Sequence, residues 1–175
     1  GDVYKRQSLL QQKAVEFCLR KAGISRKAVD LALAGDLQAQ CTASNYTMRA
    51  LEMPFAGVYG ACSTMAETLC LAASLAAGDI VSQVLAMTSS HFCAAERQFR
   101  TPLDYGAKRT PTAQWTATAA GACLLRAPGQ KGVPVLSVTF GRVQDYEVRD
   151  INNMGAAMMP AAASTLLRYF AATGT

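Results

Sequence analysis

The sequence predicts an α/β domain in which a mostly parallel sheet carries helices on both faces. Two observations predict this class. Helical and strand-like patterns alternate along residues 8–88, as is typical of parallel strands joined by helices. The short strand pattern over residues 56–59 is apolar at every position, which indicates burial on both faces. The 175 residues, 51% of them hydrophobic, are enough for one domain or part of one.

Three elements precede that apolar strand. Residues 8–22 carry apolar side chains at helical spacing, and Gly23 suits the end of a helix. A short strand pattern follows over residues 29–34. A second helical pattern covers residues 38–52 and stops before Pro54.

The two ends of the chain look incomplete. Residues 1–7 begin without Met and do not lead into the helix that follows, so we expect a non-native leader and exclude it from the fold. The chain stops at Thr175, just after a predicted helix. We therefore expect residues 8–175 to be an incomplete domain.

The strongest helical pattern covers residues 63–77, where small and apolar side chains indicate an interior helix that ends at Gly78. A strand is predicted over residues 81–88. Residues 89–111 are polar and form a long connection of the kind that often covers a functional site.

Two strands and a helix complete the prediction. Residues 112–125 continue as a strand, and a turn separates them from a β-branched strand over residues 133–143. We expect these two strands to pair antiparallel. Residues 158–172 are predicted to be helical, with Pro160 in the first turn.

Composition excludes several classes of function. The net charge is +5, but the basic residues are scattered, so a nucleic-acid partner is disfavoured. The longest apolar stretch, residues 69–77, is too short to cross a membrane, and from the polar residues 1–7 we expect no signal peptide. The six cysteines form no CxxC pair and the chain has one His, so we predict no metal site and no cofactor.

Cys62 is the first candidate for chemistry. It stands on a strand-to-helix elbow between the small residues Gly60 and Ala61 and a long helix. A thiol at a helix N-terminus has a lowered pKa and can meet an acyl group or an anion. The alternative, a cysteine used as a small core residue, has about equal weight on the local sequence.

Other candidates carry weaker signals. His91 follows a predicted strand, near the edge where open α/β sheets bind ligands, and could act as a base for Cys62. A loop histidine bonded to backbone is the simpler interpretation. Three arginines of the long connection could grip a carboxylate, although loop arginines are more often solvated or paired: Arg97, Arg100 and Arg109.

Five strings of the sequence together resemble one family, stage V sporulation protein AD of the thiolase-like superfamily. They are FAGVYGACST (55–64), TSSH (88–91), ERQFR (96–100), PTAQWT (111–116) and NNMGAAMMPAA (152–162). The last two are specific to this family, whereas the string around Cys62 alone indicates only a thiolase-like protein. The similarity runs from about Ser8 to the end of the chain.

The resemblance implies the N-terminal half of a thiolase-like fold, lacking its first strand. It places Cys62 at the position of the thiolase nucleophile, and the partner catalytic residues in a C-terminal half. It implies a sporulation protein that binds dipicolinate (pyridine-2,6-dicarboxylate) and supports its uptake into the developing spore, rather than an enzyme. We assign the ligand site to Cys62, Ser63, His91, Asn153 and Met154. The alternative is an acyltransferase or ketoacyl-synthase-like enzyme that uses Cys62 as nucleophile.

The resemblance also implies partners and a location. It predicts dipicolinate as the ligand, and other proteins of the stage V sporulation A operon, including membrane channel subunits, as protein partners. We expect a homodimer through the thiolase-type sheet, since half of such a fold leaves a sheet edge and an apolar helix face uncovered. The expected location is peripheral, on the cytoplasmic face of the forespore inner membrane.

Overall fold

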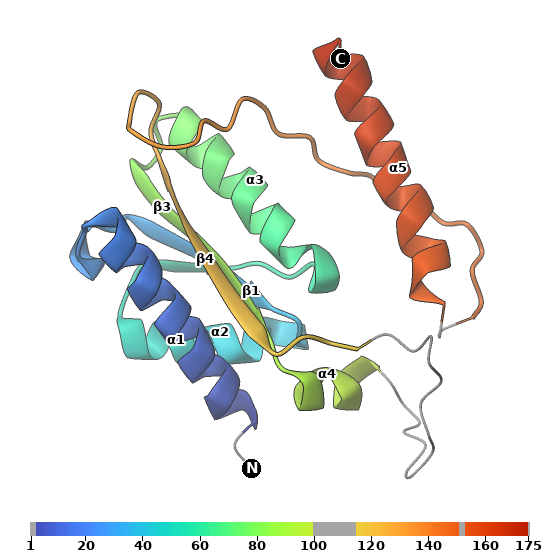
Figure 1. The fold of residues 1–175 in the computed structure, drawn as a ribbon, viewed down its shortest axis with the longest axis horizontal. Coiled ribbons are helices and arrows are strands. Elements are labelled where there is room, and N and C mark those ends of the chain that lie inside the picture. The colour runs from blue at the N-terminus through green and yellow to red at the C-terminus, as the bar shows by residue number, and fades with distance from the viewer. Residues whose placement is uncertain (1–2, 100–114, 151–152, 175) are drawn as a thin grey trace. The chain divides into compact units, whose positions relative to one another are not determined.

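The computed structural model describes residues 3–99, 115–150 and 153–174. The chain divides into two compact units, Gly1–Val133 and Pro134–Thr175. The first unit holds a four-stranded sheet, and the second holds one long helix (Figure 1). None of the helices among the described residues is both long and apolar enough to cross a membrane.

The first unit alternates helices and strands. Its main elements are α1 (Val3–Ala22), β1 (Leu31–Asp36), α2 (Thr42–Leu51), β2 (Phe55–Gly57), α3 (Thr64–Ala77), β3 (Gln83–Ser90), α4 (Phe92–Phe99) and β4 (Ala119–Arg126). The strand order is β2-β1-β3-β4. The pairs β1–β2 and β1–β3 are parallel, and β3–β4 is antiparallel. The predicted α/β class with a mostly parallel sheet is confirmed.

Helices cover both faces of this sheet, as Figure 1 shows for α1 and α2 on one side and α3 on the other. Alternate residues of the central strands contact the two layers. Leu85 and Met87 belong to the core with α1 and α2, whereas Val84 and Ala86 belong to the core with α3. This alternation decides which side chains at the strand ends face which helix.

The first helix begins earlier than predicted, at Val3, so the exclusion of residues 3–7 from the fold is wrong. Gln7 is fully buried and donates a hydrogen bond to the Ser89 hydroxyl at 3.1 Å. Polar residues on the buried face of a helix do not show in an apolar periodicity, which explains the error. The origin of residues 1–7 as a leader stays a prediction.

Burial of the second strand on both faces is also wrong. β2 spans only three residues, and Ala56 and Gly57 are exposed. It lies at the edge of the sheet, next to β1 alone. The short apolar run of residues 56–59 therefore contributes to an edge strand and not to a strand buried in the middle of the sheet.

The connection after β3 is partly helical. β3 continues to Ser90, and α4 follows at once, so residues 89–111 are not one long loop. The remainder of that predicted connection, from Arg100 to Pro111, lies outside the described residues. A polar sequence with apolar residues at helical spacing formed a short amphipathic helix.

The second unit differs from the prediction in two ways. Residues 133–143 form no strand. β-branched residues favour an extended backbone, but a strand also needs a hydrogen-bonded neighbour. The expected neighbour, β4, pairs only with β3 among the described strands. The helix α5 (Met154–Thr173) begins four residues before the predicted start. Pro160 therefore lies inside the helix and not in its first turn.

Candidate functional site

The elbow before α3 is held by a short set of backbone and hydroxyl bonds. The Val58 N–H donates to the Ala34 carbonyl at 2.9 Å and so fixes the elbow to β1. The Thr64 hydroxyl accepts from the Gly60 N–H at 3.1 Å and donates to the Ala61 carbonyl at 2.9 Å. One buried hydroxyl thus closes the turn that carries Cys62.

Close packing and strain accompany this turn. A Cβ added to Gly35 would overlap the Val58 carbonyl and the Thr64 methyl, so the elbow lies directly against β1. Ala61 has a φ of 49°, in the left-handed region that alanine rarely adopts. Such strain costs about 1–3 kcal/mol and persists only where the surroundings enforce it. The backbone beside Cys62 is therefore set by its neighbours.

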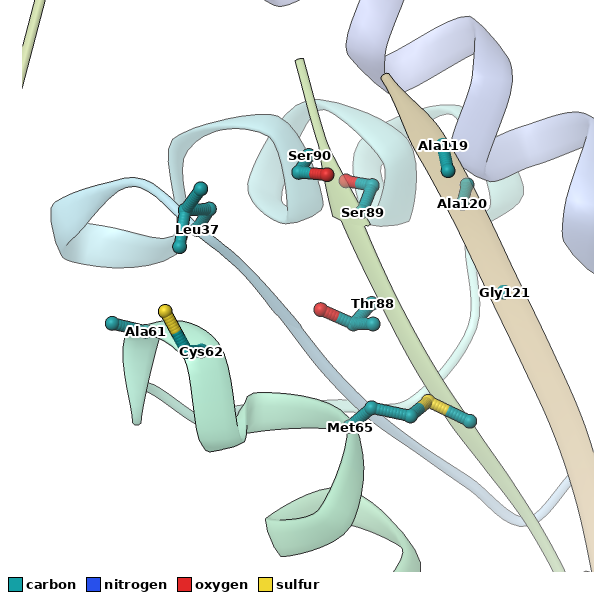
Figure 2. Close-up of a pocket in the computed structure, with 10 residues that line it drawn as sticks. All are labelled: Leu37, Ala61, Cys62, Met65, Thr88, Ser89, Ser90, Ala119, Ala120 and Gly121. Carbon is teal, nitrogen blue, oxygen red and sulfur yellow. The ribbon is translucent and has the colours of Figure 1, made fainter. Parts of the chain in front are cut away.

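Cys62 lies on the wall of an open cavity of about 280 Å³ (Figure 2). The thiol is exposed, as the elbow prediction requires, and is not a core cysteine. The cavity lies at the carboxyl ends of β1 and β3, where open α/β sheets bind ligands. Its lining residues are Leu37, Ala61, Cys62, Met65, Thr88, Ser89, Ser90, Ala119, Ala120 and Gly121.

The lining is neutral, and its polar side chains are the thiol and three hydroxyls. Ser90 donates its hydroxyl proton to the Ala117 carbonyl at 2.6 Å. The Ser89 hydroxyl accepts from Gln7 of α1, which lies on the other side of the sheet from α3. A single 3-10 turn, Ala61–Ser63, precedes α3, and the N–H groups of Ala61 and Cys62 add donors because such a turn leaves its first N–H groups without acceptors inside it.

A buried polar network supports the strand end behind the cavity. The Asp36 carboxylate is fully buried and accepts from the Gln38 N–H at 3.1 Å and from the Ser44 N–H and hydroxyl at 2.9 Å each. Burial raises the pKa of Asp36, and the hydrogen bonds from Ser44 and Gln38 oppose that rise. The Leu37 N–H donates to the Ser89 carbonyl at 3.1 Å, which places Leu37 at the cavity.

Among the predicted site residues in the described part of the first unit, only Cys62 lines the cavity. Ser63 is the neighbour of Cys62, but its exposed hydroxyl donates to the Gly60 carbonyl at 2.8 Å and it is not part of the lining. His91 follows Ser90 directly and is half-buried, and its Nδ1 has no hydrogen-bond partner among the described residues. Its side chain does not line the cavity.

The remaining predicted residues belong to the second unit, to α4 or to the part of the chain outside the described residues. Asn153 and Met154 belong to the second unit, where the Asn153 side chain accepts from the Ala156 N–H at 3.1 Å as the N-cap of α5. Arg100 and Arg109 lie outside the described residues, and only the backbone of Arg97 is described, within α4. Across the described part of the chain, no group of three or more His, Cys, Asp and Glu side chains is placed to hold a metal ion.

Sequence reasoning missed several residues around the site. Thr88, Met65 and Gly121 line the cavity. Thr88 belongs to the TSSH string (88–91), but no role was predicted for it, and Met65 and Gly121 belong to none of the five strings. Cys41 is buried, and its thiol donates to the Val58 carbonyl at 3.2 Å; burial, and after it the Asp36 carboxylate, raises the pKa of this thiol. The alternation of β3 toward α3 could have identified Thr88 once the strand boundaries were known.

Comparison with known proteins identifies a family. The sequence model described as "Stage V sporulation protein AD (SpoVAD)" matches residues 3–175. Stage V sporulation protein AD of Bacillus subtilis (strain 168) is 42% identical over 162 residues, which are 92% of this chain and 47% of that protein. The chain therefore spans about half the length of this curated relative.

Solved structures share the fold at low sequence identity. A fungal type III polyketide synthase, ORAS, matches 95% of this chain and 53% of its own with a TM-score of 0.60 and 14% identity. The 3-oxoacyl-[acyl-carrier-protein] synthase III of Aquifex aeolicus VF5 matches 69% of this chain and 38% of its own with a TM-score of 0.54 and 18% identity. At these identities the likeness concerns the fold alone, which is thiolase-like.

Proposed function

The chain belongs to the stage V sporulation protein AD family, and from this premise we propose that it binds dipicolinate in the cavity beside Cys62 and supports uptake of this dianion into the developing spore. The family gives the sporulation role. The cavity itself, open and lined by a thiol, hydroxyls and small apolar residues, is the observation that supports a small-molecule ligand. We further propose that the protein acts with membrane partners of the same operon.

The size and chemistry of the cavity suit this ligand. Its volume of about 280 Å³ lies just below the range of about 300–1,000 Å³ that holds drug-sized molecules, so a single substituted ring is an appropriate occupant. Met65 and Ala120 offer apolar surface to a ring. Hydroxyls and the N–H groups of Ala61 and Cys62, just before α3, offer donors to carboxylate oxygens.

A substitution that fills the cavity tests this function. Gly121 lies in the lining, and a Cβ there would meet no atom within 4 Å, so Gly121→Phe can place a ring in the cavity without a backbone clash. Isothermal titration of the full-length protein with dipicolinate should show binding that Gly121→Phe abolishes. Gly132→Phe is the matched control, because Gly132 also has open space around its Cβ position but lies outside the lining.

Two results would contradict the proposal. Absence of dipicolinate binding by the folded wild-type protein would remove dipicolinate as the ligand. Equal binding by wild type and Gly121→Phe would place the ligand elsewhere.

The exposure of the Cys62 thiol in this cavity favours a second candidate, acyl transfer with Cys62 as nucleophile. In that reaction the thiolate would attack an activated acyl group, form a thioester and release the acyl carrier as leaving group. Incubation of the full-length protein with acyl-coenzyme A, followed by mass spectrometry, should then reveal an acyl group that Cys62→Ala removes. Its absence would leave ligand binding as the function.

A further inference from the structure

The hydroxyls at the end of β3 face different sides of the sheet. Val84 and Ala86 contact the core beneath α3, so the alternation of the strand directs Thr88 and Ser90 toward the same side as Cys62. Ser89 faces α1, as its hydrogen bond from Gln7 shows. Two hydroxyls of β3 therefore remain on the side of the cavity that α3 and Cys62 form.

These two hydroxyls differ in what they can still bind. Ser90 uses its proton in the 2.6 Å bond to the Ala117 carbonyl, so toward a ligand it can only accept. The half-buried Thr88 hydroxyl makes no hydrogen bond to any described residue. In Figure 2 its oxygen points across the cavity, on the side of Cys62. Thr88 is thus the hydroxyl with a proton to donate.

We propose that the Thr88 hydroxyl donates a hydrogen bond to a carboxylate oxygen of the bound ligand and makes the cavity selective for anions. This inference rests on the proposed function and names the residue that recognises the charge. The described lining holds no cation, so a fixed hydroxyl donor carries a large part of the discrimination between a carboxylate and a neutral group. The β-branched side chain in a strand restricts χ1 and holds the hydroxyl in place.

Thr88→Val tests the proposal because valine keeps the shape and removes the hydroxyl. A lost hydrogen bond to a charged group should weaken dipicolinate binding about 10- to 100-fold in titrations of the full-length protein. Binding of the neutral isostere pyridine-2,6-dicarboxamide should fall only about 3- to 10-fold, since a bond to a neutral acceptor has about half the free energy of a charge-assisted one. Thr88→Ser should restore dipicolinate binding, which a purely steric role for Thr88 would not explain.

Matched variants complete the design. Thr68→Val makes the same substitution in α3, where the buried Thr68 hydroxyl donates to the Met65 carbonyl at 2.9 Å and lies outside the lining, and should bind as wild type. Ser90→Ala should weaken dipicolinate less than Thr88→Val, because the Ser90 proton is already engaged. Wild-type affinity in Thr88→Val, or equal losses for both ligands, would overturn the inference and leave the proposed function standing.

A second readout does not depend on dipicolinate. Iodoacetate carries a carboxylate and iodoacetamide does not, and both alkylate the exposed Cys62 thiol opposite Thr88. Peptide mass spectrometry gives the rate of Cys62 modification by each reagent. The iodoacetate rate divided by the iodoacetamide rate should fall in Thr88→Val and recover in Thr88→Ser. If the wild type binds no dipicolinate, the proposed ligand is wrong, and an unchanged ratio would remove the anion selectivity as well.

Discussion

Substitution of the buried Asp36 should lower the free energy of unfolding by more than substitution of an exposed aspartate does. Its buried carboxylate accepts two backbone N–H groups and one hydroxyl, and these bonds join the end of β1 to the first turn of α2. Asp36→Ala leaves the N–H groups of Gln38 and Ser44 without this acceptor, whereas the Ser44 hydroxyl can rotate. Both N–H groups lie where water has little access, since both residues are buried.

The magnitude follows from those two groups. Each buried donor without a partner costs about 1–3 kcal/mol, and removal of a buried carboxylate returns part of that sum. We therefore expect Asp36→Ala to lower the free energy of unfolding by about 2–3 kcal/mol near neutral pH. Asp30→Ala is the matched control: Asp30 accepts from the N–H groups of Ser82 and Gln83 at 2.9 and 2.8 Å, but it is exposed. Water can replace that carboxylate, so the loss should stay below about 1 kcal/mol.

The pH dependence gives a second, signed test. Burial raises the pKa of Asp36 in the folded protein above its value in the unfolded chain, so the folded state holds this proton more tightly. The contribution of Asp36 to stability is then complete below the unfolded pKa and is lost as the pH rises through the folded pKa. Relative to Asp36→Asn, which does not titrate, the wild type should lose stability across that window.

Urea denaturation of the full-length protein and its three variants, followed by circular dichroism from about pH 4 to pH 7, measures both effects. Equal losses for Asp36→Ala and Asp30→Ala would refute the argument from burial. A wild type that gains stability relative to Asp36→Asn as the pH rises would refute the sign of the pKa shift.

Two further predictions concern the elbow. Gly35→Ala should lower the free energy of unfolding in urea by about 1–3 kcal/mol, because its Cβ would overlap the Val58 carbonyl. The control Gly132→Ala should leave the free energy of unfolding nearly unchanged. Wild-type stability in Gly35→Ala would mean that the elbow does not lie against β1. Iodoacetamide at about pH 8 should modify Cys62 at least about tenfold faster than Cys41, whose thiol is buried with a raised pKa. Comparable modification rates for Cys62 and Cys41 would show that the reagent reaches Cys41 and that this thiol is not buried.

The sequence predicted the layers of the fold because periodicity reports burial. The helical spacing of residues 42–51 and 64–77 and the short apolar strands were sufficient for the α/β class. Periodicity says nothing of strand partners, which is why residues 133–143 were wrongly predicted as a strand. It also treats buried glutamines as surface residues, and Gln7 and Gln11 on α1 are fully buried through bonds to Ser89 and Ser44.

The candidate site was predicted in part for a related reason. Small residues around Cys62 indicated an elbow, and the structure places this thiol on the wall of a cavity. The opposite wall comes from β3 and β4, and its residues acquire meaning only from the register that pairs Thr88 with Gly121. Long-range pairing of this kind is not encoded in a local motif, so the TSSH string (88–91) contributed to the family resemblance but did not show that Thr88 lines the cavity.

The described walls of the cavity bear on the choice between binding and catalysis. A nucleophilic thiol needs a base within hydrogen-bond reach, and Cys62 is the only titratable residue of the lining. His91, the residue predicted for that role, follows the last β3 residue of the lining but stays outside it. A neutral wall with the Thr88 hydroxyl and the N–H groups of Ala61 and Cys62 can hold an anion without moving a proton. The described lining therefore supplies donors for an anion, and an acyl-transfer role for Cys62 requires a base from outside the described lining.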